Sequence, residues 1–530
     1  MNTGDLLTNA ARSYGPHPAF IFEGRTRTYA ESDARADALA TALIAAGVGR
    51  GDRVALSMRN CPEFLEILFA VWKMGGVVVP LNATFTADEM AWHLADAGAC
   101  VAIVDAESLA TLGPLRDGLP DLRRVICHGP APDGHGGDVT LHQELAGPVT
   151  LEQELAPYAG TPFPAVHMGR DDLAWIAYTS GTTGRPKGAM LTHGGLIHQC
   201  LTTLADVERM EQHHVGMHSA PLSHGSGHNA LVFTMKACTQ VIHQRWGFNA
   251  GLFLQQVEQY RVAAMFLVPT QIKMLVDHPD IGTRDHSSLE WIIYGGAPMY
   301  RDDQIRALKT LGPCLVQLFG QTESPMSGTV LTREEHCTDD GDGRERSVGR
   351  VRVGIELRIL DENDEEVPPG TPGEICIRGE TLMAGYWNRP EATAETLRNG
   401  WLHTGDVGSM DANGYVFILD RLKDLIISGG LNVYPIEIED VLLTHPDVSE
   451  ACVIGVPDPK WGEAVRAVVV PVTGAQIDPA ELIAFARQRL AGYKTPKAVD
   501  VVASVAKTAY GKVDKKAVRA PYWAGLGRVL

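Results

Sequence analysis

The sequence predicts an α/β protein: a large, multi-layer N-terminal domain with parallel sheets and a β-subdomain, followed by a small, mobile α+β domain. Three observations lead to this prediction. The chain has 530 residues, more than one compact core usually accommodates. Its first part alternates helix and strand patterns, and the pattern changes near residue 420. We therefore expect one domain over residues 1–420 and a second over residues 421–530.

The first part of the chain carries the alternation. Apolar residues at helical spacing, often closed by a glycine, predict helices; these span residues 29–46, 62–74 and 89–97. Short apolar runs between them predict strands at residues 53–58, 77–80 and 100–104. Strands that are separated by helices predict a mainly parallel sheet with helical cover.

The later part of the chain changes character twice. Residues 128–138 and 339–346 are polar and rich in turn-forming residues, which predicts loops. Alternating short strands with Pro-Gly turns over residues 351–378 predict the β-subdomain. Beyond residue 420, helix patterns (436–443 and 479–490) and strand patterns (450–456 and 465–472) predict the α+β domain.

The net charge argues against large, negatively charged partners. The formal net charge is −18, from 46 basic and 64 acidic side chains, so we expect no binding to nucleic acid or to acidic membranes. From Arg487 onward the balance reverses, with ten basic and two acidic residues. That stretch is either a solvated face or a surface that meets phosphates.

The cysteines and the apolar runs predict a cytoplasmic protein. The nine cysteines are odd in number and none pairs in CxxC spacing, which indicates a reducing compartment. Residues 1–15 lack a signal-peptide pattern. Lys73 and two glycines interrupt the most apolar stretch, residues 65–81, so we expect no membrane span. A homodimer is left open.

One segment indicates chemistry directly. The string YTSGTTGRPKG over residues 178–188 follows an apolar run that predicts a strand at residues 173–177. Glycines let the backbone approach a ligand, and hydroxyl and N–H groups can surround phosphate oxygens. The string does not fit the Walker A spacing, which disfavours ordinary P-loop enzymes. A glycine- and threonine-rich turn alone could equally be structural.

The complete string resembles the phosphate-binding signature of the adenylate-forming superfamily, which includes acyl-CoA synthetases. Further motifs of that superfamily follow in order along nearly the whole chain. The resemblance implies that this loop holds the phosphates of ATP. The residues implied are Thr179, Ser180, Gly181, Thr182, Thr183, Gly184 and Lys187.

Two more segments resemble the adenine-binding and metal-binding parts of the superfamily. Gly295, Gly296 and Ala297 follow a predicted strand at residues 291–294 and resemble the segment that packs on adenine. The string FGQTE resembles the YGxTE motif, with Phe319 in place of tyrosine and followed by Gly320. By this resemblance Thr322 contacts the α-phosphate and Glu323 holds Mg²⁺, a role that suits carboxylate oxygens.

The motifs nearer the C-terminus imply a ribose contact and a hinge. WLHTGD, residues 401–406, resembles the WxxTGD motif, in which Asp406 accepts hydrogen bonds from the ribose. DRLKD resembles the junction between the two domains, so Arg421 is implied to reach the nucleotide and Lys423 to be the hinge. Gly429 and Gly430 resemble the loop that enters the site when the small domain rotates.

The last motif, KTAYGK over residues 507–512, resembles the (P)KTxxGK motif, with Ala506 at the usual proline position. The resemblance implies that Lys512 is the catalytic lysine. Its charge would offset the repulsion between a carboxylate and the α-phosphate.

The segment PLSHGSG resembles the part of acid–CoA ligases that borders the acyl pocket, and His224 is implied to be catalytic there. We expect the pocket to be lined by mostly small or apolar residues: His224, Gly225, Ser226, Leu318, Pro325 and Met326. No arginine or lysine is present to pair with a second carboxylate, so an aromatic or aliphatic monocarboxylate is expected. His224 and His228 have metal-ligand spacing, but no third ligand is evident and we expect no transition metal.

The resulting hypothesis is an AMP-forming acid–CoA ligase with ATP, Mg²⁺ and coenzyme A as cofactors and a small carboxylic acid, fatty or aromatic, as partner. The chain ends at Leu530 without an appended carrier domain, which favours CoA as acceptor. Two alternatives remain open. One is an acyl-AMP ligase that loads a carrier protein, and the other is a catalytically silent binding protein.

Overall fold

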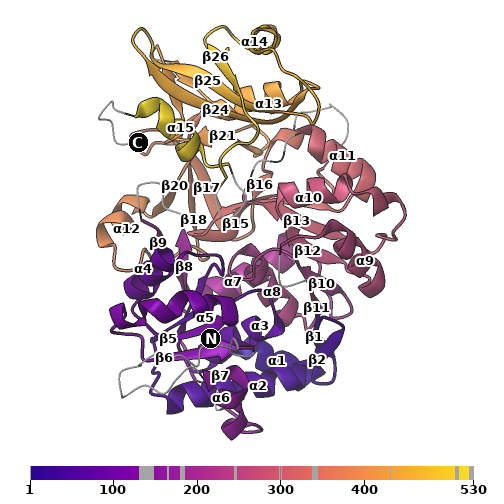
Figure 1. Cartoon of the computed structure of the whole chain (residues 1–530), viewed down its shortest axis with the longest axis vertical. Helices are drawn as coiled ribbons and strands as arrows, with labels where there is room; N and C mark the ends of the chain where they lie inside the picture. The colour runs from indigo at the N-terminus through magenta and orange to yellow at the C-terminus, as the bar shows by residue number, and fades with distance from the viewer. Residues whose placement is uncertain are drawn as a thin grey trace.

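Two helix-covered sheets form the lower and middle parts of the molecule, and a smaller unit lies above them (Figure 1). The computed structural model describes residues 2–129, 149–163, 166–179, 185–243, 247–297, 299, 301–336, 344–429, 431–507 and 513–524. The predicted loops at residues 128–138 and 339–346 lie mostly outside these residues.

The first sheet confirms the predicted alternation of strands and helices. Its described strands are parallel except for the last pair. Their order is β7 (Val149–Thr150), β6 (Arg124–His128), β5 (Ala99–Asp105), β3 (Arg53–Ser57), β4 (Val77–Leu81), β8 (Leu173–Thr179) and β9 (Lys187–Thr192).

The second sheet is parallel at its centre and antiparallel at both edges. Its order is β16 (Arg350–Val351), β15 (Ser324–Leu331), β14 (Leu315–Gln321), β13 (Trp291–Gly295), β12 (Ala264–Leu267), β10 (Val215–His218), β11 (Thr239–Ile242), β1 (Pro18–Phe22) and β2 (Arg25–Thr28).

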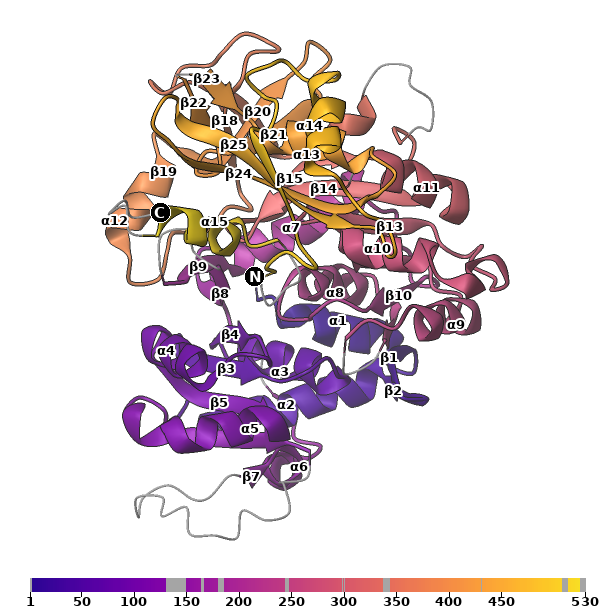
Figure 2. The same cartoon turned by 45° about the horizontal axis from the view of Figure 1, so that its top comes forward.

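Helices cover both sheets, and several lie between them (Figure 2). The helices of this part are α1 (Asp5–Tyr14), α2 (Tyr29–Ala45), α3 (Pro62–Lys73), α4 (Ala87–Ala97), α5 (Ala106–Leu112), α6 (Leu151–Leu155), α7 (His193–Asp206), α8 (Gly225–Met235), α9 (Ala250–Tyr260), α10 (Pro269–Val276) and α11 (Arg301–Leu311).

Local sequence explains where these helices begin and end. α2 and α4 start with capping boxes, in which Thr28 pairs with Glu31 and Thr86 with Glu89. α4 ends at Gly98, whose φ of 60° is the left-handed conformation that glycine adopts without strain. Every residue of α3 is buried, so this helix belongs to the core shared by the two sheets.

The predicted β-subdomain is an antiparallel sheet. It contains β17 (Ile355–Leu360), β18 (Gly373–Gly379), β20 (Trp401–Met410), β19 (Leu397–Arg398) and β21 (Val416–Arg421), together with the helix α12 (Pro390–Thr396).

The C-terminal unit has its own sheet and its own apolar core. The sheet holds β23 (Leu431–Val433), β22 (Ile426–Ser428), β25 (Gly462–Pro471), β24 (Val448–Asp458) and β26 (Ala498–Val501), and its helices are α13 (Pro435–Leu443), α14 (Pro479–Arg487) and α15 (Lys515–Trp523). The exact domain boundary at residue 420 stays a prediction.

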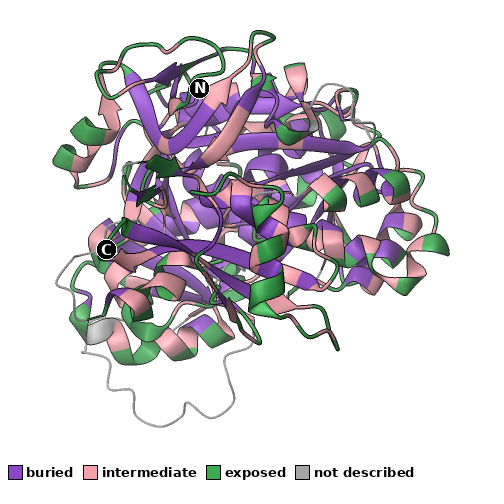
Figure 3. Cartoon of the chain, turned by 90° about the horizontal axis from the view of Figure 1, so that it is seen from above, coloured by how far each residue is buried: buried purple, intermediate pink, exposed green. Residues whose placement is uncertain are grey.

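The sheets hold the most buried residues of the molecule (Figure 3). The central strands of both large sheets are almost wholly buried, whereas α14 and the turns of the C-terminal unit are largely exposed. The described cysteines form no disulfide bonds with one another, and all of them are buried. No described helix has the length and apolarity needed to cross a bilayer.

Candidate active site

The ends of β14 and β21 meet the middle of β20 and bring the predicted residues Asp406 and Arg421 together with Gln321. The Nε2 amide of Gln321, the last residue of β14, donates hydrogen bonds to Asp406 Oδ2 at 2.6 Å and to the carbonyl oxygen of Thr404 at 2.8 Å. Arg421 lies opposite Asp406 in the register of β20 and β21. Its Nε atom is 2.9 Å from Asp406 Oδ1. Both carboxylate oxygens of Asp406 therefore have partners.

Burial dominates the electrostatics of this corner. The Asp406 side chain is 5% exposed, and this burial raises its pKa above the ordinary value, although Arg421 and the Gln321 hydrogen bond act in the opposite direction. Burial likewise lowers the pKa of Lys423, against the influence of Asp424. Asp514, which precedes α15, also acts on Lys423. The predicted hinge thus lies close to Asp514 in space.

Glu323 is oriented by a residue that the sequence did not indicate. The hydroxyl of Tyr386 donates a 2.6 Å hydrogen bond to Glu323 Oε1. The Nζ atom of Lys187 lies 4.4 Å from the centre of the Tyr386 ring, a cation–π distance. Tyr386 is 5% exposed, and burial together with Glu323 raises its pKa. Tyr386 therefore joins the phosphate-loop strand to the predicted metal ligand.

Backbone contacts join the start of β9, the turn at Glu323 and the segment around Tyr386. The N–H of Met383 donates to the carbonyl oxygen of Glu323 at 2.8 Å, and the N–H of Trp387 donates to that of Gly188. Ala189 and Tyr386 form an isolated antiparallel bridge. We call the resulting group the polar half of the site; its members are Lys187, Gln321, Glu323, Tyr386, Asp406 and Arg421.

Glycines in the predicted adenine-binding segments allow backbones to meet closely. A Cβ atom on Gly295 would lie 2.4 Å from the carbonyl oxygen of Leu318, and one on Gly320 would lie 2.9 Å from Met326 N. Gly296 has a φ of +75°. A larger residue at Gly295 would push β13 away from β14, and one at Gly320 would push β14 away from β15, so these two positions require glycine for structural reasons as well. Ala297 follows Gly296, Phe319 is buried, and Thr322 lies in the turn before β15.

Apolar side chains form the other half of the site, where the predicted acyl pocket lies. Leu318, Met326 and Phe233 belong to one buried cluster, and Phe266 packs against it. Gly225, the first residue of α8, faces Phe266, because a Cβ atom there would lie 3.2 Å from the ring. We call Gly225, Phe233, Phe266, Leu318 and Met326 the apolar half of the site.

Two pairs of neighbouring polar residues in this region are hydrogen-bonded to each other. Ser223 Oγ and His224 Nδ1 are 2.8 Å apart. Ser226 Oγ lies 2.9 Å from His218 Nδ1 and is fully buried, so its hydroxyl is directed into the core. His228 stacks on Trp175 at 5.0 Å, and burial lowers its pKa to about 4. Pro325 is buried in β15.

Several predicted site residues lie outside the described part of the chain: Ser180, Gly181, Thr182, Thr183, Gly184, Gly430 and Lys512. Thr179 ends β8. Gly429 is described, with a φ of +61°, and a Cβ atom there would lie 2.8 Å from the Trp461 ring. Trp461 could not be singled out from the sequence.

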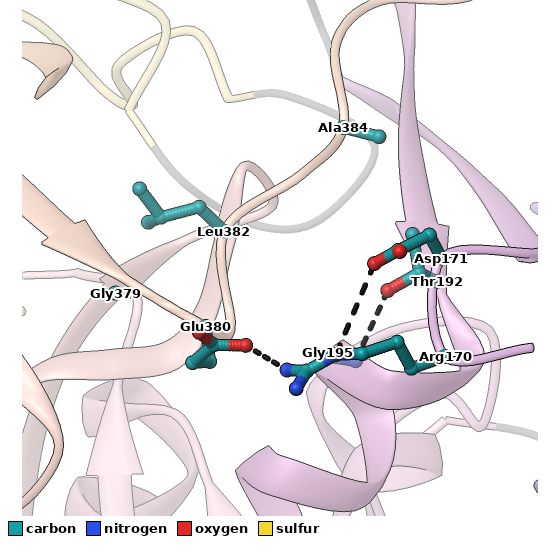
Figure 4. Close-up of a pocket in the computed structure, with 8 residues that line it drawn as sticks. All are labelled: Arg170, Asp171, Thr192, Gly195, Gly379, Glu380, Leu382 and Ala384. Carbon is teal, nitrogen blue, oxygen red and sulfur yellow. Dashed lines mark hydrogen bonds and ion pairs between the residues drawn. The ribbon is translucent and has the colours of Figure 1, made fainter. Parts of the chain in front are cut away.

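A separate cavity of about 240 Å³ lies between the start of α7 and the segment after β18 (Figure 4). Arg170 and Glu380 form an ion pair across it, and Thr192 caps α7 through the N–H of Gly195. None of the predicted site residues lines this cavity, so it is not the site described above.

Comparison with known proteins identifies the family. A model of the AMP-binding enzyme family matches residues 7–387, and a model of the AMP-binding enzyme C-terminal domain matches residues 437–512. The chain belongs to the AMP-binding enzyme family. The predicted resemblance to adenylate-forming enzymes is therefore confirmed.

Two relatives match over almost their full length. This AMP-binding enzyme is 41% identical to feruloyl-CoA synthase of an Amycolatopsis species, over 95% of the chain and 96% of that protein. It is 36% identical to the medium/long-chain-fatty-acid–CoA ligase FadD8 of Mycobacterium tuberculosis, over 100% of the chain and 91% of that protein.

Solved structures of MatB from Rhodopseudomonas palustris add information about conformation. The ATP-bound form shares 31% identity with a TM-score of 0.86, and the apo form shares 32% with a TM-score of 0.76; both comparisons cover 100% of each chain. Because the identities are nearly equal, the difference between the scores reflects conformation. The AMP-binding enzyme described here is arranged more like the ATP-bound form.

Proposed function

We propose that this protein is an AMP-forming acid–CoA ligase. It activates a fatty or aromatic monocarboxylate with ATP, releases pyrophosphate, and then transfers the acyl group from acyl-AMP to the thiol of CoA. The observation that carries the proposal is the convergence of Glu323, Asp406 and Lys187 at one corner, in a chain whose family binds AMP.

The polar half suits the nucleotide. Asp406 and Arg421 present a carboxylate and a guanidinium side by side, which suits the two hydroxyls of a ribose. The Gln321 amide fixes the carboxylate before the substrate arrives. Lys187, held over Tyr386, contributes positive charge toward phosphate oxygens. The segment of Gly295, Gly296 and Ala297 then packs on adenine, opposite Phe319.

Mg²⁺ fits Glu323. Its carboxylate is hard and partly exposed, and one oxygen is already oriented by Tyr386. When bound, Mg²⁺ supplies positive charge that offsets the charge on the phosphates. Thr322, the neighbour of Glu323, is then in position to hydrogen-bond the α-phosphate.

In the first half-reaction, a carboxylate oxygen attacks the α-phosphorus, an acyl-AMP forms, and the bond to pyrophosphate breaks. Lys512 lowers the repulsion between these two anions. The similarity to ATP-bound MatB supports an arrangement suited to this step.

In the second half-reaction, the small domain rotates about Lys423, so that Lys512 leaves and the loop of Gly429 and Gly430 enters. His224 lies at the boundary of the acyl pocket during this step. The thiolate sulfur of CoA attacks the carbonyl carbon, the bond to AMP breaks, and AMP leaves. The proposal includes a cytoplasmic location and leaves a homodimer open.

A panel assay tests the function. Pyrophosphate release with MgATP is measured for aromatic and C2–C18 acids, each with and without CoA. We expect one acid class to give release that turns over repeatedly only when CoA is present. Release that stops after one turnover regardless of CoA would contradict the acceptor and indicate a carrier protein.

A further inference from the structure

One polar side chain beside the apolar half has no hydrogen-bond partner among the described residues. Asn229 lies in α8, is 0% exposed, and neither its Nδ2 nor its Oδ1 atom hydrogen-bonds to any described residue. Two other polar side chains of the same helix are satisfied, whereas Nδ1 of the adjacent His228 also lacks a hydrogen-bond partner among the described residues. Ser226 pairs with His218, and Thr234 accepts a 3.0 Å hydrogen bond from Gln240. Asn229 differs from these residues because neither its donor nor its acceptor atom has a partner among the described residues.

The helical spacing of Asn229 places it on the face of α8 that borders the apolar half of the site. Residues four apart lie on one face of a helix, so Gly225, Asn229 and Phe233 form one stripe along α8. Gly225 faces Phe266, and Phe233 packs with Leu318 and Met326. Asn229 lies between them, about 6 Å further along the helix axis than Gly225.

A second buried polar group lies beside the same cluster. Glu208 is 1% exposed, and neither of its carboxylate oxygens has a hydrogen-bond partner among the described residues. Its neighbours Val207 and Met210 belong to the cluster of Leu318 and Met326. Burial raises the pKa of Glu208 to about 8, against the influence of Arg352, so at neutral pH it is mainly a protonated donor.

Unpaired amides are costly inside an apolar wall. A buried donor or acceptor without a partner loses its hydration without compensation. A pocket built only for hydrocarbon would be better served by leucine, which has a similar size. A hydroxyl group is both donor and acceptor, and it can satisfy both atoms of the amide.

We propose that Asn229 hydrogen-bonds a hydroxyl group carried on the apolar body of the substrate acid, so that the enzyme selects hydroxylated acids over their deoxy analogues. This inference rests on the proposed acid–CoA ligase activity. A site that offers hydrogen bonds rejects the analogue without the hydroxyl, because its own polar groups then stay unpaired.

Matched pairs of acids test the inference. CoA-dependent AMP release is measured for cinnamate against its 2-, 3- and 4-hydroxy derivatives, and for octanoate against 8-hydroxyoctanoate. We expect kcat/KM to be roughly tenfold or more higher for at least one hydroxylated acid than for its partner. If the wild-type enzyme turns over these acids with no such preference, the inference is overturned and Asn229 is satisfied by water.

Two variants locate the effect. Asn229→Leu should reduce or invert the preference while the deoxy acid is still turned over. Thr234→Val removes a buried polar group of the same helix that already has a protein partner, and it should leave the preference unchanged. An unchanged preference in Asn229→Leu would overturn the inference. The failure of every acid to give CoA-dependent AMP would instead overturn the proposed function.

Discussion

The two halves of the site differ in how their polar groups are satisfied. In the polar half, Asp406 has partners on both oxygens and Glu323 is held by Tyr386. Beside the apolar half, Asn229 and Glu208 are buried without hydrogen-bond partners among the described residues. The first half is organised before any ligand binds, whereas the second leaves hydrogen bonds to be made.

This difference corresponds to what each half must recognise. Every reaction of an adenylate-forming enzyme uses the same nucleotide, so its binding groups can be fixed in advance. The acid differs between relatives, whose names include both feruloyl-CoA and fatty-acid–CoA enzymes. Selectivity therefore has to come from the half whose contacts are completed by the substrate itself.

The largest effect should come from the proposed catalytic lysine. Lys512→Ala should reduce acyl-AMP formation by roughly 10² to 10³ while ATP still binds, because one key electrostatic contact is lost. Pyrophosphate release and ATP titration measure the two effects separately. Lys507, an exposed lysine that pairs with Glu450, is the control, and Lys507→Ala should retain adenylation. Near-wild-type adenylation by Lys512→Ala would remove this residue from the mechanism.

A smaller effect should come from the ribose contact. Asp406→Asn keeps the shape but removes the charge that faces Arg421, and kcat/KM for ATP should fall by roughly tenfold or more. The same substitution should leave the ranking of acids unchanged, because the polar half does not contact the acyl body. Glu356→Gln, an exposed partner of Arg378 in the same subdomain, should have no effect. A changed acid ranking in Asp406→Asn would contradict the separation of the halves.

Removing one hydroxyl should have a more modest effect. Tyr386→Phe retains the ring under Lys187 but frees Glu323, so the apparent affinity for Mg²⁺ should fall by up to about tenfold. Activity measured against Mg²⁺ concentration tests this expectation, and saturating Mg²⁺ should restore most of the rate. The control is Tyr415→Phe, which removes a comparable hydroxyl–carboxylate bond to Glu335 outside the site. An equal loss at all Mg²⁺ concentrations would mean that Tyr386 has only a structural role.

Two buried histidines near the apolar half should also lower the stability of the folded protein in acid. Burial lowers the pKa of His218 and of His228 to about 4, below the value of about 6.5 in unfolded chains. Between these values the unfolded chain binds more protons, so stability falls as the pH drops from 6.5 toward 4. Each histidine should contribute roughly 1 kcal/mol of this loss by pH 5.5.

Thermal unfolding of the wild-type protein and of His228→Gln, followed from pH 7 to pH 5, tests this prediction. The variant should lose less stability on acidification than the wild-type protein does. Parallel curves would show that His228 does not titrate in this way.

The sequence predicted the arrangement of sheets and most of the polar half. Glycine-rich strings and charged residues at fixed spacings are local signals, so Lys187, Glu323 and Asp406 could be selected before their positions were known. Tyr386 could not, because its role comes from a contact with Glu323, 63 residues away. The sequence could not predict that Asn229 is unpaired either, because this depends on whether residues distant in the sequence provide a hydrogen-bond partner.

The most direct test of the account follows an oxygen atom. An accepted acid, labelled with ¹⁸O at both carboxylate oxygens, is converted with ATP and CoA, and the AMP is analysed by mass spectrometry. The account predicts one ¹⁸O in the phosphate of AMP, because the carboxylate oxygen bonds to the α-phosphorus and stays there when the thioester forms. AMP without label, or label in inorganic phosphate, would contradict an acyl-AMP intermediate.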